Sequence, residues 1–253
     1  MVNNYYKENA YNWQTNCDIL FQQAWHILFS EVYKSLGDIK NKKILDAGCG
    51  QGAFYNYIKN AQYYGIDISN ENIKIAKNIN NNNNFIVQNI LKTEYSDNYF
   101  DALVSIEVIE HLTIEELDRF LYEIKRITKK GSTIVITTPN LYYLWGLIPW
   151  SFYPIRRRLT FSKFIKGILH GYVNENYNIS AHHYRFKPIF LRKRISKIFK
   201  VLQITSTYWY NNRAIHGIFS KTQLSLLNWS NIFKSRYILL GSQLVIICKN
   251  NKD

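Results

Sequence analysis

The chain of 253 residues is poor in the features that define several whole classes of protein. Its 3 cysteines, Cys17, Cys49 and Cys248, are far apart and lack the spacing of metal ligands. An odd, dispersed set excludes a disulfide framework and a zinc module, and it fits a reducing compartment. The first eight residues contain no apolar core, so we expect no signal peptide.

Long hydrophobic runs are also missing. A membrane-spanning helix needs about 20 consecutive apolar residues. The longest candidate, Leu141 to Ile155, is shorter and contains Pro149 and Pro154. The content of 47% hydrophobic and 20% charged residues is typical of a globular chain. We therefore expect a cytoplasmic protein, with at most a peripheral contact with a membrane.

Acidic residues are scarce in the second part of the chain. Residues 141–253 hold 18 Lys/Arg and 2 Asp/Glu, whereas residues 1–140 hold 14 and 16. The net charge of +14 therefore originates entirely behind Asn140. Such an asymmetry favours an anionic partner, which would be a nucleic acid, a membrane surface or an acidic glycan. An AT-rich genome, with its many Lys codons, is the plainer explanation of part of this charge.

Strands and helices alternate in the first part of the chain. Apolar runs predict strands at 43–47, 63–67, 85–87, 100–105 and 133–137. Helical periodicity predicts helices at 15–36, 54–59, 70–78 and 114–128, the last of them capped by Thr113 and ended by Gly131. This alternation is typical of a doubly wound α/β domain with a mostly parallel sheet. Farther along, a helix at 188–200 and strands at 201–210 and 242–248 are expected to complete the sheet.

A glycine-rich loop follows the first predicted strand. The sequence from Leu45 to Gly52 is Leu-Asp-Ala-Gly-Cys-Gly-Gln-Gly, and a predicted helix comes next. Glycines let a backbone turn sharply and approach a ligand closely. Asp67 ends the second predicted strand, where an acid can accept hydrogen bonds from both hydroxyls of a ribose. The two features together predict a nucleotide site at the carboxyl edge of the sheet.

The loop resembles that of the class I S-adenosylmethionine-dependent methyltransferases rather than that of the dehydrogenases. It has the pattern Leu-Asp-x-Gly-Cys-Gly-x-Gly, not Gly-x-Gly-x-x-Gly. Residues 98–105, followed by Glu-Val-Ile-Glu-His-Leu at 107–112, are similar to the fourth strand and following loop of that family. The resemblance is strong over residues 40–140 and weak elsewhere. It implies a Rossmann-like sheet of seven strands with an antiparallel last strand, and S-adenosylmethionine as the cofactor.

The same resemblance implies one methyltransferase domain over residues 1–253. We expect an N-terminal helical region at 1–40 and a cofactor-binding core at 41–140. A basic, aromatic, helical lid is expected at 141–185, and a closing helix and strands at 186–253.

The family pattern also assigns residues to the cofactor. Residues from Asp46 to Gly52 would line its methionine end, and Asp67 and Ile68 would hold the ribose. The family often has an Asp that contacts the adenine amino group, and this chain has Asn89 there, whose carbonyl oxygen can accept the same hydrogen bond. Glu107 would touch the methionine moiety or order its loop. The predicted cofactor-binding residues are Asp46, Gly48, Cys49, Gly50, Gly52, Asp67, Ile68, Asn89, Ile90 and Glu107.

The predicted catalytic residue is His111, just past the fourth strand. It would act as the general base for a hydroxyl acceptor, although it could instead pack against or cap the following helix. We predict O-methylation of a small-molecule, lipid-linked or saccharide hydroxyl, and N-methylation stays open because nothing in the sequence identifies the acceptor atom.

A metal-dependent alternative rests on the same loop. Glu107, Glu110 and His111, with His182 or His183, resemble the ligands of the small-RNA 3′-end 2′-O-methyltransferases, which bind a divalent ion. The chain lacks that group's His-x-Asp-His core and the acid after its Pro-Asn pair. We therefore predict no metal. A metal-dependent RNA 2′-O-methyltransferase and a non-catalytic cofactor-binding protein remain the alternatives.

The basic aromatic segment allows three interpretations. Residues 156–200 hold 12 Lys/Arg and one acid, Glu175, and aromatic and aliphatic residues surround them. The segment could be a plain lid over the active site with solvated cations. It could also lie on an anionic membrane or bind a lipid-linked substrate, as basic amphipathic helices do. Single-stranded nucleic acid, stacked on the rings, is the third and least expected partner.

Overall fold

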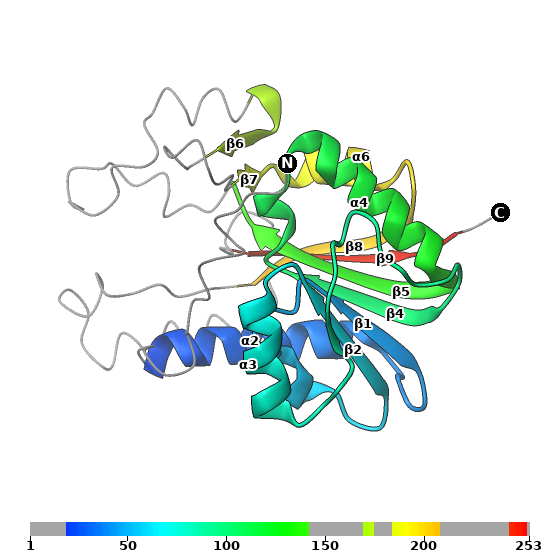
Figure 1. Cartoon of the computed structure of the whole chain (residues 1–253). Helices are drawn as coiled ribbons and strands as arrows, with labels where there is room; N and C mark the ends of the chain where they lie inside the picture. The colour runs from blue at the N-terminus through cyan, green and yellow to red at the C-terminus, as the bar shows by residue number, and fades with distance from the viewer. Residues whose placement is uncertain (1–18, 142–168, 175–183, 208–242, 252–253) are drawn as a thin grey trace.

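The computed structural model describes residues 19–141, 169–174, 184–207 and 243–251, with a single seven-stranded sheet at its centre (Figure 1). The strand order is β3-β2-β1-β4-β5-β9-β8. Neighbours from β3 to β5 pair in parallel, and β9 is antiparallel to both of its neighbours. This confirms the predicted sheet. The strands are β1 (Lys43–Ala47), β2 (Gln62–Asp67), β3 (Phe85–Val87), β4 (Phe100–Ile106), β5 (Thr128–Pro139), β8 (Lys200–Thr207) and β9 (Gln243–Lys249).

Helices cover both faces of the sheet (Figure 1). Alternate residues of the central strands point to opposite faces, so Leu45 and Leu103 pack under one pair of helices and Ile44 and Val104 under the other. This two-sided burial explains why the strands are apolar almost throughout. The helices on the first face are α4 (Ile114–Ile127) and α6 (Pro188–Ile195), and those on the second are α2 (Ile19–Leu36) and α3 (Asn70–Asn80).

The start of α4 agrees with the prediction. The Thr113 hydroxyl accepts a hydrogen bond from the Glu116 backbone N–H at 3.2 Å, and the Glu116 carboxylate accepts one from the Thr113 N–H at 2.9 Å. This reciprocal capping box satisfies two backbone donors at the helix terminus. It fixes the point at which the loop after β4 enters the helix.

The segment predicted as a helix at 54–59 is instead a single 3-10 turn, η1 (Ala53–Tyr57). The aromatic side chains of η1 explain why this helical segment is short. Phe54 and Tyr57 both pack on Phe29 of α2, with ring centroids 5.6 and 5.3 Å apart. Once these contacts are made, the chain extends at Ile58 toward β2.

Two other boundaries differ from the predictions because long-range contacts override local signals. The strand β5 begins at Thr128, ahead of Gly131, because Thr128 pairs with Phe100 and accepts hydrogen bonds from the Asn250 side chain. Helix α6 ends at Ile195 rather than at residue 200, because a turn carries the buried Ile198 into the core before β8 begins.

The described part of the predicted lid contains a feature that the sequence did not predict, a two-stranded antiparallel sheet. It consists of β6 (Tyr172–Asn174) and β7 (Tyr184–Phe186). The Leu141 N–H donates to the Phe186 carbonyl at 3.0 Å, so β7 is joined to the chain that leaves β5. Residues 142–168 and 175–183, where most of the helical lid was expected, lie outside the described residues. Within the described ranges, every helix is too short or too polar to cross a bilayer.

Candidate functional site

The site lies where the chain reverses direction across the sheet. From β1 the chain proceeds outward to β2 and β3, and it then returns to β4 on the other side of β1. Ligands of open α/β sheets bind beyond the carboxyl ends of the strands at such a point. The loops after β1 and β4 touch there: a Cβ atom added to Gly48 would lie 2.5 Å from Cγ2 of Val108.

The loop after β1 is anchored to β2 and open on its other side. The Gly48 and Cys49 N–H groups donate to the Ile66 carbonyl at 2.8 and 2.9 Å. Gly48 and Gly50 have φ angles of +85° and +53°, a region that favours glycine. A Cβ atom added to Gly50 would meet nothing within 4 Å, in contrast to Gly48. The loop therefore presents its backbone at Gly50 to open space, as a ligand-binding loop must.

Asp67, at the end of β2, connects this loop to the next one. One carboxylate oxygen accepts a hydrogen bond from the Gly50 N–H at 2.9 Å, and the other accepts from the Ser69 N–H at 2.9 Å and the Asn72 amide at 3.4 Å. Burial raises the pKa of Asp67, and the hydrogen bonds from Ser69 and Gly50 oppose that rise. The structure thus places Asp67, followed by Ile68, directly beside the glycine loop, where the sequence predicted the ribose site.

Asp46 contributes a buried carboxyl group that is only partly satisfied. It is 2% exposed, and one oxygen accepts a hydrogen bond from the Tyr63 hydroxyl at 2.5 Å. The other oxygen has no partner among the described residues. Burial raises the pKa of Asp46 to about 7, while the Tyr63 hydrogen bond lowers it and the Asp67 charge adds to the rise. An unsatisfied buried oxygen is costly, so this one is a place for a donor or cation from a ligand.

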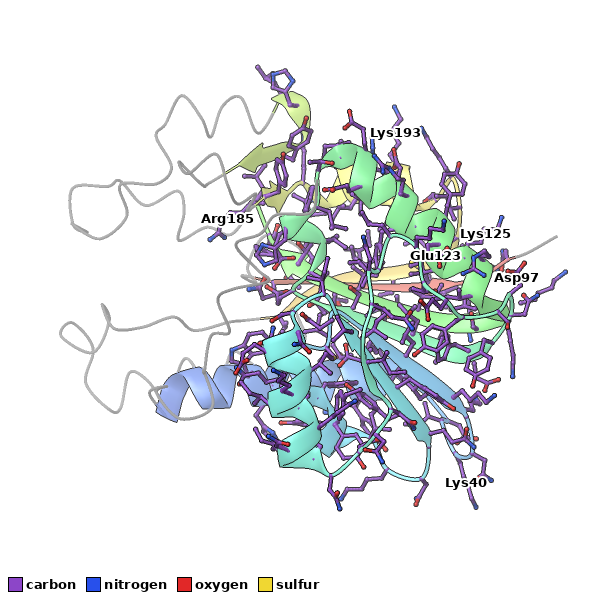
Figure 2. The ribbon with its side chains drawn as sticks, in the orientation of Figure 1. Lys40, Asp97, Glu123, Lys125, Arg185 and Lys193 are labelled. Atoms are coloured by element: carbon purple, nitrogen blue, oxygen red, sulfur yellow. The ribbon has the colours of Figure 1, made fainter. Side chains whose placement is uncertain are left out.

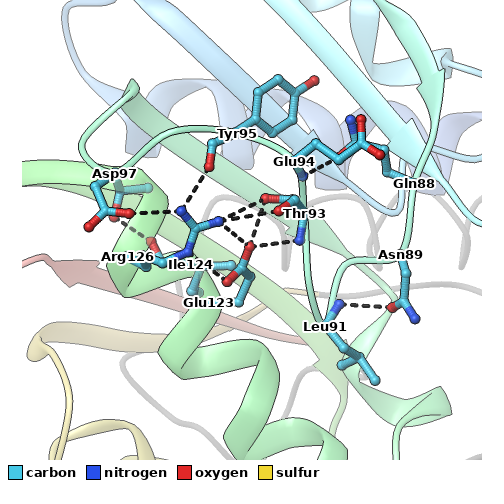
Figure 3. Close-up of polar contacts among 11 residues, drawn as sticks. Gln88, Asn89, Leu91, Thr93, Glu94, Tyr95, Asp97, Glu123, Ile124 and Arg126 are labelled. Carbon is cyan, nitrogen blue, oxygen red and sulfur yellow. Dashed lines mark hydrogen bonds and ion pairs between the residues drawn. The ribbon is translucent and has the colours of Figure 1, made fainter.

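Asn89 follows β3 and continues the same edge. The backbone N–H of Gln88 donates to the Asp67 carbonyl at 3.0 Å, so the ends of β2 and β3 are joined. The Asn89 side-chain oxygen accepts a hydrogen bond from the Leu91 N–H at 2.9 Å (Figure 3). The neighbouring Ile90 is half-buried against the core. The predicted cofactor residues after β1, β2 and β3 therefore lie in order along one edge.

Glu107 stands on the other side of the reversal point, directly after β4. Its φ angle of +55° is unusual for a residue other than glycine, and Thr137 of β5 holds it in place. The Glu107 N–H donates to the Thr137 hydroxyl at 3.1 Å, and that hydroxyl donates to the Glu107 carboxylate at 2.8 Å. Burial raises the pKa of Glu107 to about 8, and the Thr137 hydrogen bond and the charge of Arg185 oppose that rise.

Glu110 adds a second carboxyl group from the same loop. It is 1% exposed, and the Thr138 hydroxyl donates to it at 3.3 Å. Burial, followed by the nearby charge of Glu107, raises the pKa of Glu110 well above its usual range. The positive charge of Arg185 partly offsets the rise in pKa at both carboxyl groups. Arg185 lies on β7 (Figure 2).

The sequence assigned no individual role to Thr137 or Thr138, and it placed Arg185 only at the end of the predicted lid. Two adjacent hydroxyl residues directly after the buried run Ile134–Ile136 are a usable signal, because hydroxyls at a strand end face the loops of neighbouring strands. The position of Arg185 near Glu107 and Glu110 depends on the bridge between Phe186 of β7 and Asn140, which follows β5, and a local pattern does not reveal such a contact.

His111 ends the 3-10 turn η2 (Ile109–His111), as expected just past β4. It is half-buried, and its N–H donates to the Val108 carbonyl at 3.0 Å. Over the parts of the chain that the structure describes, no group of three His, Cys, Asp or Glu side chains is arranged to hold a metal. His182 and His183 lie outside those parts, so the absence of a metal stays a prediction.

Comparisons with known proteins show which proteins this chain is similar to. A family model described as a methyltransferase domain matches residues 45–136. An uncharacterised protein of Methanocaldococcus jannaschii is 32% identical over 197 residues, which cover 72% of this chain and 85% of that protein. The ubiquinone biosynthesis O-methyltransferase of Pelagibacter ubique is 32% identical over 113 residues, which cover 40% and 44%.

The fold is also that of a solved structure, the phosphoethanolamine N-methyltransferase 2 of Haemonchus contortus in complex with S-adenosyl-L-methionine. The TM-score is 0.55 at 16% identity, over 92% of this chain and 53% of that one. Apart from the archaeal relative, the chain spans about half or less of the length of the curated relatives it matches.

The residues present fit a cofactor of this kind. The unsatisfied oxygen of Asp46 and the carboxylate of Asp67 suit a ligand with cationic groups and a ribose. The open space over Gly50 leaves room for it. The match of residues 45–136 includes the loops after β1, β2, β3 and β4 that form the edge. The chain therefore belongs to the class I S-adenosylmethionine-dependent methyltransferases, with S-adenosylmethionine as its cofactor.

Proposed function

We propose that the protein is an O-methyltransferase that acts on a small-molecule, lipid-linked or saccharide hydroxyl. The observation that carries the proposal is the placement of His111 and Glu107 on one loop, which meets the glycine loop at the contact between Gly48 and Val108. S-adenosylmethionine supplies a methyl group that its sulfonium makes electrophilic. The protein has to hold the acceptor in line with that group and remove its proton.

The cofactor would be held along the edge in the order of the strands. Asp46 and the loop residues Gly48, Cys49, Gly50 and Gly52 would line the methionine end, where the unsatisfied oxygen of Asp46 lies. Asp67 and Ile68 would hold the ribose, and Asn89 and Ile90 the adenine. Glu107 would border the methionine end from the side of β4, supported by its reciprocal hydrogen bonds with Thr137.

His111 would accept the proton of the acceptor hydroxyl. Removal of a positioned general base typically lowers the turnover rate by about 10²–10⁴-fold. His111→Asn should therefore reduce transfer of labelled methyl groups to extracted lipids, glycans or small molecules by that factor and leave cofactor affinity unchanged. His26→Asn, on helix α2, is the matched control and should keep the wild-type rate. If the two variants transfer methyl groups at equal rates, His111 is not the general base.

An amine acceptor is the second candidate, because two carboxyl groups of the same loop are buried near each other. When ionised, Glu107 or Glu110 would attract an ammonium group and take its proton, which leaves the amine with the lone pair that accepts the methyl group. Mass spectrometry of the methylated product distinguishes the candidates, because an N-methylated product contradicts O-methylation. Binding of the cofactor without transfer to any extract would favour the non-catalytic alternative.

We also propose a cytoplasmic location with peripheral contact with anionic membranes. Support comes from exposed cations on and after α6, namely Arg192, Lys193, Lys197 and Lys200, beside Ile189, which is 64% exposed. Residues 156–168 of the basic aromatic segment, for which membrane contact is one of the three interpretations, lie outside the described residues. The protein should float with anionic vesicles at low salt and less at high salt. Failure to float at low salt would exclude this contact.

A further inference from the structure

The loop between β3 and β4, residues 88–99, is held firmly by its own hydrogen bonds and by helix α4 (Figure 3). The Gln88 side chain accepts a hydrogen bond from the Glu94 N–H at 3.2 Å, which closes the loop on itself. The backbone N–H and hydroxyl of Thr93 both donate to one carboxylate oxygen of Glu123 on α4 at 2.7 Å. These contacts fix where the loop lies relative to the helix.

Arg126 of α4 strengthens this attachment. It binds the Glu123 carboxylate through two nitrogens, at 3.0 and 2.7 Å, and donates to the Tyr95 carbonyl and the Asp97 carboxylate, both at 2.8 Å (Figure 3). Bidentate, charge-assisted hydrogen bonds are among the strongest in proteins. Although burial alone would raise it, the hydrogen bonds from Arg126 and Thr93 lower the pKa of Glu123, so the carboxylate stays ionised at neutral pH. The loop is therefore preorganised before any ligand binds.

Asn89 has a defined amide orientation within this loop. Its side-chain oxygen accepts the Leu91 N–H at 2.9 Å, and its backbone carbonyl accepts the Lys92 N–H at 3.1 Å. A backbone N–H is only a donor, so the amide atom that faces Leu91 has to be the oxygen. The NH₂ group of Asn89 is then the part left for a ligand, and the described residues provide it with no acceptor.

This NH₂ group lies at the position along the edge where a purine would follow the ribose. The Gln88 N–H donates a hydrogen bond to the Asp67 carbonyl, so the following residue, Asn89, lies next to the end of β2, which carries the proposed ribose-binding carboxylate. An adenine ring offers acceptors at its ring nitrogens and one donor, its 6-amino group. Two donors cannot bond to each other, whereas an NH₂ group can donate to a ring nitrogen.

We propose that Asn89 recognises the purine of the cofactor as a hydrogen-bond donor, which makes the 6-amino group of adenine nearly dispensable for binding. This inference rests on the proposed cofactor site. An Asp at this position would present an acceptor to the amino group, as the family pattern has it. Asn89 is thus a specificity-determining residue, and the contacts of the loop with Glu123 and Arg126 hold it in its orientation.

The experiment compares two ligands by calorimetry. One is S-adenosylhomocysteine, and the other is its 6-deamino analogue, with purine in place of adenine. The wild-type protein should bind the two with dissociation constants within about threefold of each other. In Asn89→Asp, the carboxylate gains a charge-assisted bond from the amino group, so the variant should prefer S-adenosylhomocysteine by about tenfold.

A matched control lies at the opposite end of β3. The Asn82 side-chain oxygen accepts the Asn84 N–H at 2.9 Å, the same turn as at Asn89, so Asn82→Asp makes the same chemical change away from the edge. Its preference should equal that of the wild type. A wild-type protein that binds the deamino analogue ten times more weakly overturns the inference, and so does an unchanged preference in Asn89→Asp. If the wild type binds neither ligand, the proposed cofactor site has failed instead.

Discussion

The two sides of the site differ in how the chain builds them. The cofactor edge, formed by the loops after β1, β2 and β3, depends on partners close in sequence, such as Gly50 and Asp67, which are 17 residues apart. The acceptor edge, formed by the loop after β4, the end of β5 and β7, joins Glu107 to Thr137, 30 residues away, and brings up the charge of Arg185 from β7. A local motif therefore identifies the first edge, and only the folded sheet assembles the second.

Asp67 of the cofactor edge also differs from the two glutamates of the acceptor edge in how its carboxyl group is supported. Asp67 accepts hydrogen bonds from two backbone N–H groups and one side-chain amide. The carboxylates of Glu107 and Glu110 each accept a hydrogen bond from one threonine hydroxyl, and the charge of Glu107 further raises the pKa of Glu110. Protonation should therefore matter more at the acceptor edge than at Asp67, and single substitutions can test this.

The largest effect is expected where the two edges touch. Gly48→Ala would place a methyl group 2.5 Å from Val108 at a φ of +85°, and the strain and overpacking should destabilise the protein by about 2–4 kcal/mol. Gly37→Ala is the matched control, because its φ is +72° but nothing lies within 4 Å. Thermal unfolding measures both, and Val108→Ala in the Gly48→Ala background should recover part of the loss. If Gly48→Ala and Gly37→Ala reduce the free energy of unfolding equally, the two edges are not in tight contact at Gly48.

The parts that the sequence predicted are those with local causes. The parallel strands β1 to β4 were predicted close to their observed bounds because each is a short apolar run, and the glycine loop was recognised from its spacing. The early start of β5 was missed because Asn250, more than a hundred residues away, holds Thr128 in the sheet. The donor orientation of Asn89 was missed for a similar reason. The sequence shows an amide, and only the folded loop determines which of its atoms faces Leu91.

A smaller effect is expected inside the cofactor edge. Asp67→Ala removes the acceptor for ribose hydroxyls and also frees the Gly50 and Ser69 N–H groups, so it should weaken binding of S-adenosylhomocysteine by about 1.5–3 kcal/mol. Asp101→Ala is the control, because that carboxylate accepts from the Lys43 N–H and the Lys129 ammonium at the amino end of the sheet. Calorimetry should show its affinity unchanged. Wild-type affinity in Asp67→Ala would contradict the ribose assignment.

The smallest effect is a pH dependence at the acceptor edge. Burial raises the pKa of Glu107 from 4.5 to about 8 in the folded state, with Thr137 and Arg185 opposing. Between these pH values the folded state keeps a proton that the unfolded chain has released, so the stability contributed by this group falls as pH rises. Relative to Glu107→Gln, which does not titrate, the wild type should lose about 1 kcal/mol between pH 5 and pH 6, or ~2–4 °C in melting temperature.

Glu123→Gln is the contrasting control for that measurement. The hydrogen bonds from Arg126 and Thr93 lower the pKa of Glu123, so its stabilising charge is complete above its ordinary pKa and lost only at more acidic pH. This variant should therefore be less stable than the wild type by an amount that stays constant between pH 5 and pH 8. A constant gap for Glu107→Gln as well would mean that Glu107 is already ionised at pH 5. Its carboxylate would then be stabilised as well as that of Asp67. The two edges would then differ only in how far apart in sequence their contacting residues lie.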